Sequence, residues 1–389
     1  MRRGRMLSSI FDIEFNPNKH LVHWDRINAL AQGKDTSPVT LELDVCSICN
    51  HNCEWCVDPP GVHSNQLMPV PIAKRIMEEA KELGVKGIVF KGGGESTLHP
   101  KFDEIIKIAD KMDFEIGVVT HGGKLNNQKL LNALVQYSAY VRISIDGPTP
   151  ESRKEIHGAD DFYSMVKGIK KLIAIKQSKR HPIVGATFCL DYSRRFLIDK
   201  CIQLGEELCL DYVLIRPPFC EEVGFPAPYT PEEAAILRNE IRRAAENYTG
   251  EIPIMVGNWI GDKELEKLYS KKRESDLARR DLSIRLFRYN GIEHVTKRCL
   301  ASLLFIVITA ECEVYGCCCL RGIKEFSFGK INSDAGISLT SIMGSERRKQ
   351  CLAKMRRVEC LKYCTHPLAK INELIEYLSL PEKYHSSFI

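Results

Sequence analysis

The sequence predicts an α/β protein: a partial (β/α)6 TIM-like barrel followed by a small cysteine-rich domain. Between residue 41 and about residue 216, short β-rich runs alternate with helical patterns, the order that produces a parallel sheet with helices outside it. Polar and glycine-rich segments recur where these runs end, and from residue 299 closely spaced strand-like runs replace the alternation. Ligands of such sheets collect at the carboxyl ends of the strands, so we expect the chemistry at that edge.

The barrel prediction depends on six candidate strands and on the helical stripes between them. We expect the strands at residues 41–45, 86–90, 114–120, 140–146, 183–190 and 212–216. Between the first two, apolar residues recur at helical spacing, and Gly84 stands where a helix would end. The clearest later stripes are Phe102, Ile105, Ile106 and Ala109, then Phe162, Met165, Val166, Ile169 and Ile173. Right-handed crossovers between these strands predict an open or closed barrel.

The second half of the chain is organised differently. After residue 218 the alternation stops, and Thr230 and Glu233 predict a capping box that starts a helix ending near Asn247. The charged segment 262–290 reads as a solvated helical face. We divide the chain into an N-terminal extension (1–40), a core (41–225), a helical linking segment (226–298) and a C-terminal domain (299–389).

Composition narrows the class of protein. The 389 residues are 44% hydrophobic and 27% charged, which is ordinary globular usage, and the net charge of +5 is scattered rather than gathered in a patch. The N-terminus has no secretory pattern, and the longest apolar run, residues 303–308, is too short to cross a bilayer. We therefore expect a cytoplasmic protein that acts on neither membranes nor nucleic acid.

Sixteen cysteines point to metal, because clustered thiols in a reducing compartment more often bind metal than form disulfides. Residues 46–56 read CSICNHNCEWC and place Cys46, Cys49, Cys53 and Cys56 in one loop after the first expected strand. Thiolates at such short spacing can surround one iron–sulfur cluster. Zinc is the alternative, but zinc sites usually take ligand pairs from two separated segments, and no second pair follows closely.

The spacing Cys49-x3-Cys53-x2-Cys56, with Trp55 before the last cysteine, resembles the signature of the radical S-adenosylmethionine (radical SAM) family. The resemblance implies that these cysteines hold a [4Fe–4S] cluster whose fourth iron binds the amino and carboxylate groups of S-adenosylmethionine. It also implies that an electron from the cluster cleaves this cofactor to a 5′-deoxyadenosyl radical, in chemistry that the protein orients. Cys46 lies outside the spacing, as a spare thiol or a fallback ligand.

A glycine-rich segment after the second expected strand supports this resemblance. KGGGESTLHP resembles the family's Gly-Gly-Glu-Pro motif, which implies that Gly93, Gly94 and Glu95 receive the amino group of the cofactor. Ser96 stands where the family usually has proline, and a plain turn with a solvated glutamate is the alternative.

Further candidates follow the next strands. Thr120 and His121 resemble the family's Thr-Asn-Gly turn, and His121 either contacts the cofactor or substrate or caps the turn. Ser144 and Asp146 share one face by alternation, and the resemblance places the serine near the cofactor. The remaining candidates are Arg153, followed by Ile156, His157 and Gly158 in a common family pattern, and Arg216 at the end of the last strand. Arg153 is either a carboxylate clamp or part of a surface salt bridge, and Arg216 would hold cofactor or substrate.

A second set of cysteines lies in the C-terminal domain. ECEVYGC followed by FSFGKIN resembles the hairpin of the SPASM and twitch auxiliary domains, although Lys330 interrupts the usual Gly-Asn pair. The one-cluster twitch variant fits best, which implies an auxiliary [4Fe–4S] cluster held by Cys299, Cys317, Cys360 and Cys364. Cys318 and Cys319 compete with Cys317 as ligand. Zinc and simple buried thiols are the alternatives.

We therefore expect a radical SAM enzyme that abstracts hydrogen from its substrate and receives electrons from a donor such as flavodoxin or ferredoxin. Few residues precede the cysteine loop, too few for the leader-peptide domain of many peptide modifiers. This favours a small polar metabolite of sugar, aminoglycoside or nucleotide type over a peptide or protein residue as the substrate. A non-enzymatic iron–sulfur or zinc protein is the remaining alternative, which the glycine-rich motif opposes.

Overall fold

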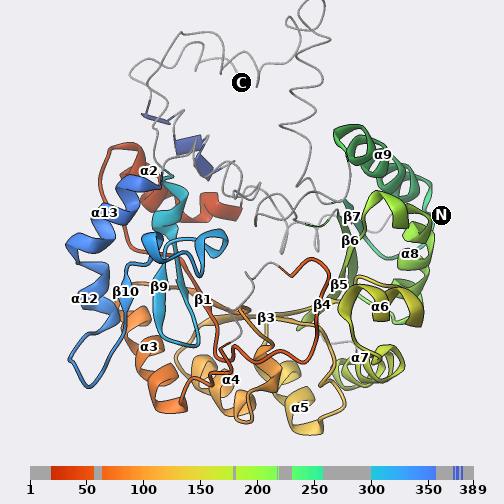
Figure 1. Ribbon diagram of the computed structural model, residues 1–389, viewed down its shortest axis with the longest axis horizontal. Helices are drawn as coiled ribbons and strands as arrows, with labels where there is room; N and C mark the ends of the chain where they lie inside the picture. Colours follow the sequence, from red (N-terminus) through yellow and green to blue (C-terminus); the bar gives the residue numbers. More distant parts are fainter. Residues whose placement is uncertain are drawn as a thin grey trace, which may run out of the picture.

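The structure is a computed structural model that describes residues 19–56, 64–177, 181–216, 218, 230–256 and 299–355, with 371–372, 374–375 and 378–379. In these residues one ten-stranded sheet has the order β10-β9-β8-β1-β2-β3-β4-β5-β6-β7. Figure 1 shows the strands in an open arc with helices along its outer side. The predicted partial α/β barrel is confirmed.

The six expected core strands are present within a few residues of their predicted ends. Their bounds are β1 Thr40–Leu43, β2 Gly87–Phe90, β3 Glu115–Thr120, β4 Tyr140–Ser144, β5 Ile183–Cys189 and β6 Tyr212–Arg216. Each is parallel to the next along the chain. This arrangement brings the carboxyl ends of all six strands to one edge of the sheet.

The helices between these strands cover the outer face of the sheet. They are α3 Val70–Glu82, α4 Phe102–Lys111, α5 Gln128–Tyr137, α6 Pro150–His157, α7 Phe162–Lys176 and α8 Ile198–Glu207, with 3-10 turns η2 Ser96–Leu98 and η3 Tyr192–Leu197. The predicted stripe on α4 is fully buried, and Gly84 follows α3 with a φ of 90°. The residue that follows the C-terminus of this helix adopts the left-handed region, and glycine does so without strain.

Strand alternation separates two packed layers. The main core lies between the sheet and the helices. The strands contribute to it Leu41, Leu43, Ile88 and Phe90, together with the residues at equivalent positions of β3 to β6. The opposite, inner face has its own small cluster of Ile183, Tyr212, Leu214 and Met255, with Tyr140 packed against it.

Two tyrosines of this inner cluster lie across glycines of the neighbouring strand. A Cβ added to Gly117 would lie 2.3 Å from the ring of Tyr140, and one added to Gly185 would lie 2.1 Å from the ring of Tyr212. Both glycines are therefore required by the tyrosines beside them.

The N-terminal extension contains an element that was not predicted. After the 3-10 turn η1 Lys19–His23, helix α2 Trp24–Ala31 buries Ile27 and Leu30. Arg26 donates to the carbonyl oxygens of Ser37 at 3.1 Å and Gly84 at 2.9 Å, which ties this helix to the end of α3.

The cysteine-rich C-terminal region continues the barrel sheet. Its elements are η5 Ala301–Leu304, β8 Phe305–Ile308, β9 Glu313–Tyr315, η6 Cys318–Leu320, η7 Lys324–Phe326, β10 Gly329–Lys330, α12 Leu339–Met343 and α13 Glu346–Lys354. The predicted strand-like runs form β8, β9 and β10, which pair antiparallel. Strand β8 is also parallel to β1, with Thr40 opposite Phe305. The predicted C-terminal domain therefore contributes three strands to the sheet of the barrel.

The linking segment is helical only in part. Helix α9 Pro231–Asn247 begins at the predicted capping box of Thr230 and Glu233. The helical interpretation is wrong for Ile254–Val256, which form β7 and pair parallel to β6. Residues 257–298 of this segment lie outside those described.

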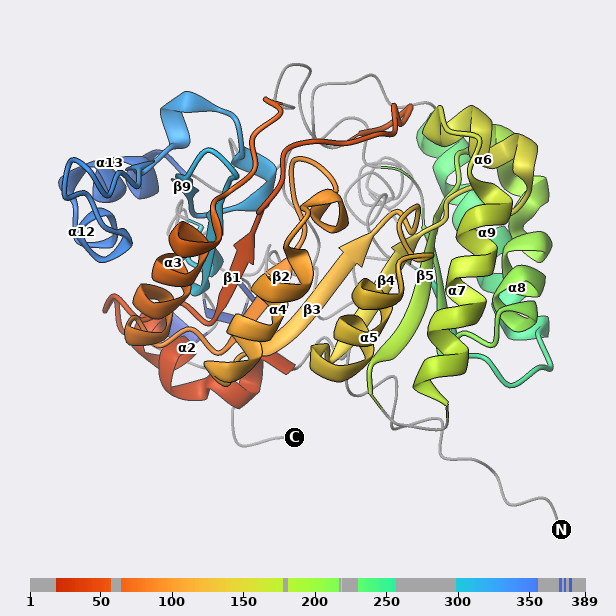
Figure 2. The same cartoon turned by 90° about the horizontal axis from the view of Figure 1, so that it is seen from below.

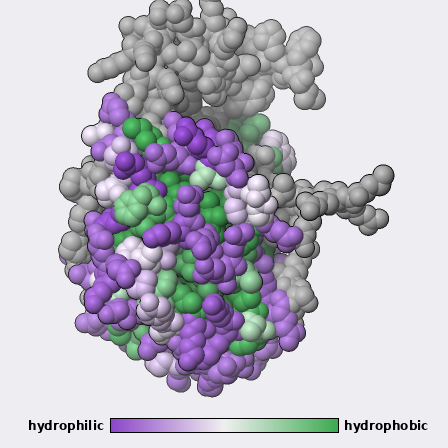
Figure 3. All heavy atoms as spheres, turned by 90° about the vertical axis from the view of Figure 1, so that its right-hand side faces the viewer, coloured by the Kyte–Doolittle hydropathy of each residue, from purple (hydrophilic) through white to green (hydrophobic). Residues whose placement is uncertain are grey.

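Figure 3 shows the outer face on the right-hand side of Figure 1, where most of the visible surface is hydrophilic and hydrophobic atoms lie between. None of the described helices combines the length and the apolar character needed to cross a membrane.

Replacement of Gly185 by alanine tests the packing of Tyr212. We expect the free energy of unfolding to fall by about 1–3 kcal/mol, because the new methyl group overlaps a fully buried ring. Urea unfolding of Gly185→Ala measures this, with Gly344→Ala as control because its nearest atom is 3.7 Å away. The penalty should shrink in the Tyr212→Leu background; an equal penalty there would remove the ring overlap as its cause.

Candidate functional site

The predicted site residues follow different strands but lie at one edge of the barrel. In Figure 2 the strand arrows point toward this edge, and the loop after β1 runs along it. The loop after β1 carries Cys49, Cys53 and Cys56, and the loop after β2 carries Gly93, Gly94 and Glu95. The parallel order of the strands therefore places both motifs next to each other.

Asp44 joins the cysteine loop to the glycine-rich loop. Its Oδ1 accepts the backbone N–H of Cys46 at 3.2 Å, and its Oδ2 accepts the backbone N–H of Gly93 at 2.8 Å. The side chain is buried, and it is the first residue after β1. Asp44 was not among the predicted site residues, although an acid directly between a strand and a cysteine loop was a usable signal.

The glycines after β2 allow these two loops to touch. A Cβ on Gly92 would lie 2.4 Å from the Cβ of Asp44, and a Cβ on Gly94 would lie 2.5 Å from the carbonyl oxygen of Ile48. The backbone N–H of Glu95 donates to that same carbonyl at 2.9 Å. Close backbone contact therefore accounts for glycine at positions 92 and 94.

The far end of the cysteine loop is held by the C-terminus of α6. The backbone N–H groups of Asn52 and Glu54 donate to the carbonyl oxygens of His157 at 2.9 Å and Ile156 at 2.8 Å. Gly158 ends α6 with a φ of 63°, and a side chain there would meet Asn52 at 3.0 Å. The segment Ile156-His157-Gly158 therefore serves to anchor the cysteine loop.

Arg194 adds a second attachment for this loop. Its guanidinium bonds to Glu54 at 2.9 Å, to Glu155 of α6 at 2.6 Å and to Asp191 at 3.0 Å. The same group lies 5.1 Å from the ring centre of Trp55, a cation–π distance. No sequence signal pointed to this residue, because its partners come from three separate segments.

The donor set of this loop fits an iron–sulfur cluster. Burial raises the pKa of the Cys53 thiol, and the charges of Asp146, Cys56 and Cys49 raise it further, so the three thiols are electrostatic neighbours. Three cysteine sulfurs from one loop are the ligand set of a cluster with one open iron. Cys46 is disposed differently: it is fully buried, its thiol donates to the carbonyl of Ile48, and burial raises its pKa to about 11.

Glu95 is buried and accepts hydrogen bonds from the ends of two strands. Its Oε1 accepts from Thr97 N at 3.1 Å, Thr97 Oγ1 at 2.5 Å and Thr120 Oγ1 at 2.6 Å, and its Oε2 accepts from His121 N at 2.8 Å. Burial acts to raise its pKa, but these hydrogen bonds outweigh it and hold the pKa below the usual range. The carboxylate is therefore ionised and joins the β2 and β3 loops, in addition to its predicted role toward the cofactor.

His121 has both ring nitrogens engaged by the protein. Its Nε2 lies 2.9 Å from Asn50 Oδ1, and its Nδ1 accepts the backbone N–H of Gly123 at 3.0 Å. Burial lowers its pKa, so the neutral ring with the proton on Nε2 satisfies both contacts. Of the two predicted roles, the bond to Gly123 corresponds to the turn cap, and the ring also stacks on His51 with centroids 3.6 Å apart.

Arg153 is fully buried and directs all its N–H groups to the protein. Its Nε and one terminal nitrogen bind Asp161 at 2.6 and 3.1 Å. The terminal nitrogens also donate to the carbonyl oxygens of Ser144, Ile145 and His121 at 3.2, 3.1 and 2.8 Å. In this arrangement the bidentate partner of Arg153 is Asp161 rather than a cofactor carboxylate, and the salt bridge is buried rather than on the surface.

Asp146 follows β4 in the left-handed region, with a φ of 54°. Its Oδ1 accepts Cys189 N at 2.9 Å, and its Oδ2 lies 2.9 Å from His157 Nε2. Burial acts to raise its pKa, but the hydrogen bonds from His157 and Cys189 N prevail, with a contribution from Arg216, so the pKa is lowered. Ser144 and Arg216 end β4 and β6 and are half-buried.

Below this edge, the inner face of the barrel carries charged side chains. Glu42, Lys91 and Arg142 alternate with core residues of β1, β2 and β4 and so lie on the inner face. Lys91 Nζ is 3.3 Å from Glu42 Oε2, and Arg321 of the C-terminal region is 3.6 Å from Glu42 Oε1. Glu42 raises the pKa of Lys91, whereas Arg142 and Arg321 oppose this effect.

The second cysteine set is described only in part. Cys299 is half-buried beside the core, with the side-chain amide of Asn372 donating to its sulfur at 3.3 Å, and Cys317 is buried. Cys318 is an electrostatic neighbour of Glu42 and Lys91, which lie on the inner face of the barrel. Cys360 and Cys364 lie outside the described residues.

Residues 43–186 match the family model described as the Radical SAM superfamily. This span begins at the end of β1 and ends in β5, and so includes the cysteine loop, the glycine-rich loop and Arg153. Residues 43–186 of the chain therefore form a radical SAM domain. The cofactors of this superfamily are a [4Fe–4S] cluster and S-adenosylmethionine, the two that the sequence predicts.

Among curated proteins, the chain is similar to the mycofactocin maturase MftC of Mycobacterium ulcerans, with 25% identity over 138 residues that cover 36% of this chain and 37% of the relative. It is also similar to the GTP 3',8-cyclase of Photorhabdus laumondii, with 27% identity over 145 residues that cover 36% of this chain and 43% of the relative. The chain thus matches less than half the length of either relative.

Solved structures share the fold over a longer span. Streptococcus suis SuiB bound to precursor peptide SuiA superposes with a TM-score of 0.57 at 14% identity, covering 90% of this chain and 76% of that chain. Native anSMEcpe with bound AdoMet and Cp18Cys peptide gives a TM-score of 0.56 at 13% identity, covering 86% and 85%. At these identities the similarity is one of fold.

Replacement of Asp44 by alanine tests the junction of the two loops. We expect the affinity for S-adenosylmethionine to fall by about 10–100-fold, because the two loops lose their shared acceptor. For the same reason, the iron retained per chain after reconstitution should fall by about half. Equilibrium dialysis and iron analysis measure these quantities. Asp113→Asn is the control, since Asp113 lies on the surface away from this edge; unchanged cofactor affinity in a folded Asp44→Ala protein would contradict the assignment.

Proposed function

We propose that this enzyme cleaves S-adenosylmethionine at a [4Fe–4S] cluster held by Cys49, Cys53 and Cys56 and abstracts a hydrogen atom from a small polar metabolite. The observation that carries the proposal is the junction at Asp44, which places the cysteine loop against the glycine-rich loop. When bound, the reduced cluster would supply the electron that converts the cofactor to methionine and the 5′-deoxyadenosyl radical. The substrate would be oxidised or rearranged as a result.

Several residues at this edge of the sheet would hold the cofactor, each in a different way. Gly93 and Gly94 would receive its amino group through their backbone, with Glu95 fixing the shape of their loop. Thr120, His121, Asp146 and Arg153 would position the surrounding turns through the contacts described above. Ser144 and Arg216 would contact the cofactor or the substrate from the ends of β4 and β6.

The substrate would lie against the inner face of the barrel. Lys91 and Arg142 are electrostatic neighbours of like charge there, with Glu42 beside Lys91. A face with charges of both signs suits a polar molecule that offers acceptors to the cations, such as a sugar, an aminoglycoside or a nucleotide. The name of the GTP 3',8-cyclase relatives supports the nucleotide type.

Modification of a peptide or protein residue is the second candidate. Its support is that the fold neighbours SuiB and anSMEcpe were solved with peptides bound. An auxiliary [4Fe–4S] cluster at Cys299, Cys317, Cys360 and Cys364 belongs to either candidate, as does a one-electron donor such as flavodoxin or ferredoxin. We place the enzyme in the cytoplasm, where its many thiols stay reduced.

The first test compares the wild type with a triple variant, Cys49→Ala, Cys53→Ala and Cys56→Ala. Anaerobic iron analysis should give about eight irons per wild-type chain and about four in the variant, since each cluster holds four. The variant should also release no 5′-deoxyadenosine. Cys209→Ala, at an exposed thiol, is the control and should match the wild type. Cofactor cleavage by the triple variant would overturn the assignment of the first cluster, and a wild type with only four irons would remove the auxiliary cluster.

The second test addresses the substrate. In Arg142→Gln we expect 5′-deoxyadenosine release stimulated by sugar, aminoglycoside or nucleotide pools to fall by about 10–100-fold, as for a lost hydrogen bond to a charged group, while cofactor affinity is unchanged. Arg142→Lys keeps the charge and should retain more of the stimulation. Stimulation of the wild type by peptides alone would replace the small metabolite by the peptide candidate, and a loss of cofactor affinity in Arg142→Gln would move this residue to the cofactor.

A further inference from the structure

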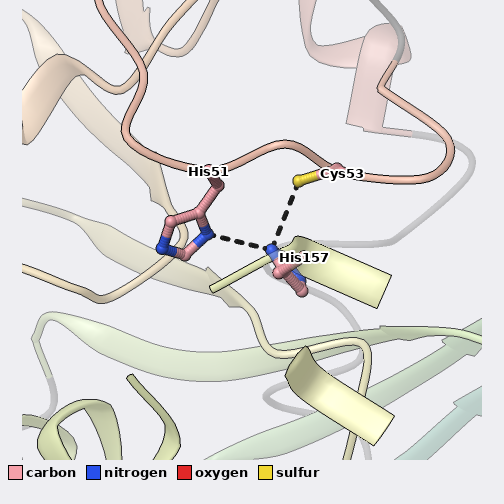
Figure 4. A group of neighbouring side chains, drawn as sticks. All are labelled: His51, Cys53 and His157. Carbon is pink, nitrogen blue, oxygen red and sulfur yellow. Dashed lines mark hydrogen bonds between the residues drawn. The ribbon is translucent and has the colours of Figure 1, made fainter. Parts of the chain in front are cut away.

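Two buried histidines and one half-buried cysteine form a compact group between the cysteine loop and α6. Figure 4 shows His51 and Cys53 on the loop and His157 at the end of α6, with their donor atoms directed toward one another. His157 Nδ1 is 3.1 Å from His51 Nδ1 and 3.3 Å from Cys53 Sγ. All three ligand atoms lie within 4.8 Å of one another.

Carboxylates fix the outer nitrogen of both rings. His157 Nε2 is 2.9 Å from Asp146 Oδ2, and His51 Nε2 is 3.1 Å from Asp161 Oδ2. A carboxylate accepts hydrogen bonds and does not donate them, so each Nε2 carries a proton. The two Nδ1 atoms then face each other, 3.1 Å apart. A metal ion or a shared proton between the two nitrogens makes such a contact favourable.

The residues around this group hold the two carboxylates and the ring of His51 in position. Asp161 is held by Arg153 at 2.6 Å, and Asp146 is held by the backbone of Cys189 at 2.9 Å. The ring of His121 stacks on His51 at 3.6 Å and fixes its plane. His121 itself is not a donor to the group, because its own nitrogens are engaged by Asn50 and Gly123.

The separations of His157 Nδ1 from the other two donor atoms are those of ligands around one small cation. Bond lengths of about 2.0–2.1 Å to nitrogen and about 2.3 Å to sulfur in a tetrahedral zinc site place the ligand atoms roughly 3.3–3.6 Å apart. The observed 3.1 and 3.3 Å are close to these separations. A histidine whose second nitrogen donates to a carboxylate is also the usual form of a metal-bound histidine.

We propose that His51, Cys53 and His157 bind one divalent transition-metal ion of the zinc class, with Asp161 and Asp146 orienting the two imidazoles. Mixed imidazole and thiolate donors favour such an ion over magnesium or calcium. Three protein ligands leave at least one coordination position open. The ion uses Cys53, which the proposed function assigns to the cluster, so the ion and the complete cluster exclude each other on one chain.

The site therefore belongs to the chain before its cluster is assembled. The ion would join the cysteine loop to the end of α6 through Cys53 and His157, parallel to the backbone bonds of Asn52 and Glu54. Cluster assembly would then require the ion to leave, because Cys53 can serve only one of them. Zinc in the purified protein would mark chains without a cluster.

Cobalt(II) titration of the metal-free, cluster-free full-length chain tests the proposal. Tetrahedral cobalt with a thiolate ligand has visible and near-ultraviolet absorption bands that report its ligands directly. We expect one equivalent to bind to the wild type with these bands and to be displaced by zinc. Cys56→Ala should bind cobalt equally well, since it removes a cluster cysteine and leaves the three donors. His51→Ala and Cys53→Ala should lose the site, and Asp161→Asn should weaken it by about 10–100-fold.

His181→Gln, at an exposed histidine, is the matched control, and circular dichroism with thermal unfolding establishes which variants are folded. Unchanged cobalt binding in folded His51→Ala would overturn the proposal, as would loss of binding in folded Cys56→Ala, which would assign the ion to the cysteines alone. If His51→Ala fails to fold, His51→Gln replaces it, with the same expected loss. Iron content and cofactor cleavage are measured separately, so a wild type that binds cobalt but assembles no cluster would overturn only the proposed function.

Discussion

The buried carboxylate of Asp44 is the contact on which the candidate site depends. Two loops from different strands must meet for the cysteines and the glycine-rich backbone to act on one ligand, and Asp44 accepts one N–H from each. Because Asp44 directly follows β1, its position is set by the sheet rather than by the loops. Removing the carboxylate would leave two N–H groups without this acceptor, in a region where unpaired backbone groups are unfavourable. The sheet thereby determines how the two loops are arranged at the carboxyl ends of its strands.

Much of the fold could be predicted because the relevant signals are local. Alternating strand and helix patterns indicated all six core strands, and Thr230 with Glu233 indicated the start of α9. Strand β7 was missed because three residues carry too little periodicity to be recognised. The pairing of β8 with β1 was missed for a different reason, since which strands become neighbours is decided by tertiary packing. A local sequence pattern therefore does not predict which strands pair.

In the site, the types of residue could be predicted from the sequence, whereas their hydrogen-bond partners could not. Cysteine spacing and the glycine run indicated where chemistry would occur, because those residue types are needed for it. The partners of Arg153 were not predictable, because they are carbonyl oxygens at the ends of β3 and β4 and a carboxylate after α6. A buried guanidinium needs acceptors for all its N–H groups, and only the folded chain determines which acceptors are near. A residue that resembles a cofactor ligand in sequence, such as Arg153, can thus be engaged by the protein itself.

The pairing of β8 with β1 has a consequence for how the chain is made. Thr40 is synthesised early and Phe305 late, yet they are neighbours in the sheet. Until residue 308 has left the ribosome, β1 has an unpaired edge. Glu42 lacks the positive charge of Arg321 until residue 321 has followed. Contacts so distant in sequence form slowly, and chains with exposed strand edges are prone to aggregate. Strand β1 is therefore paired on both edges only after the chain as far as β8 has emerged.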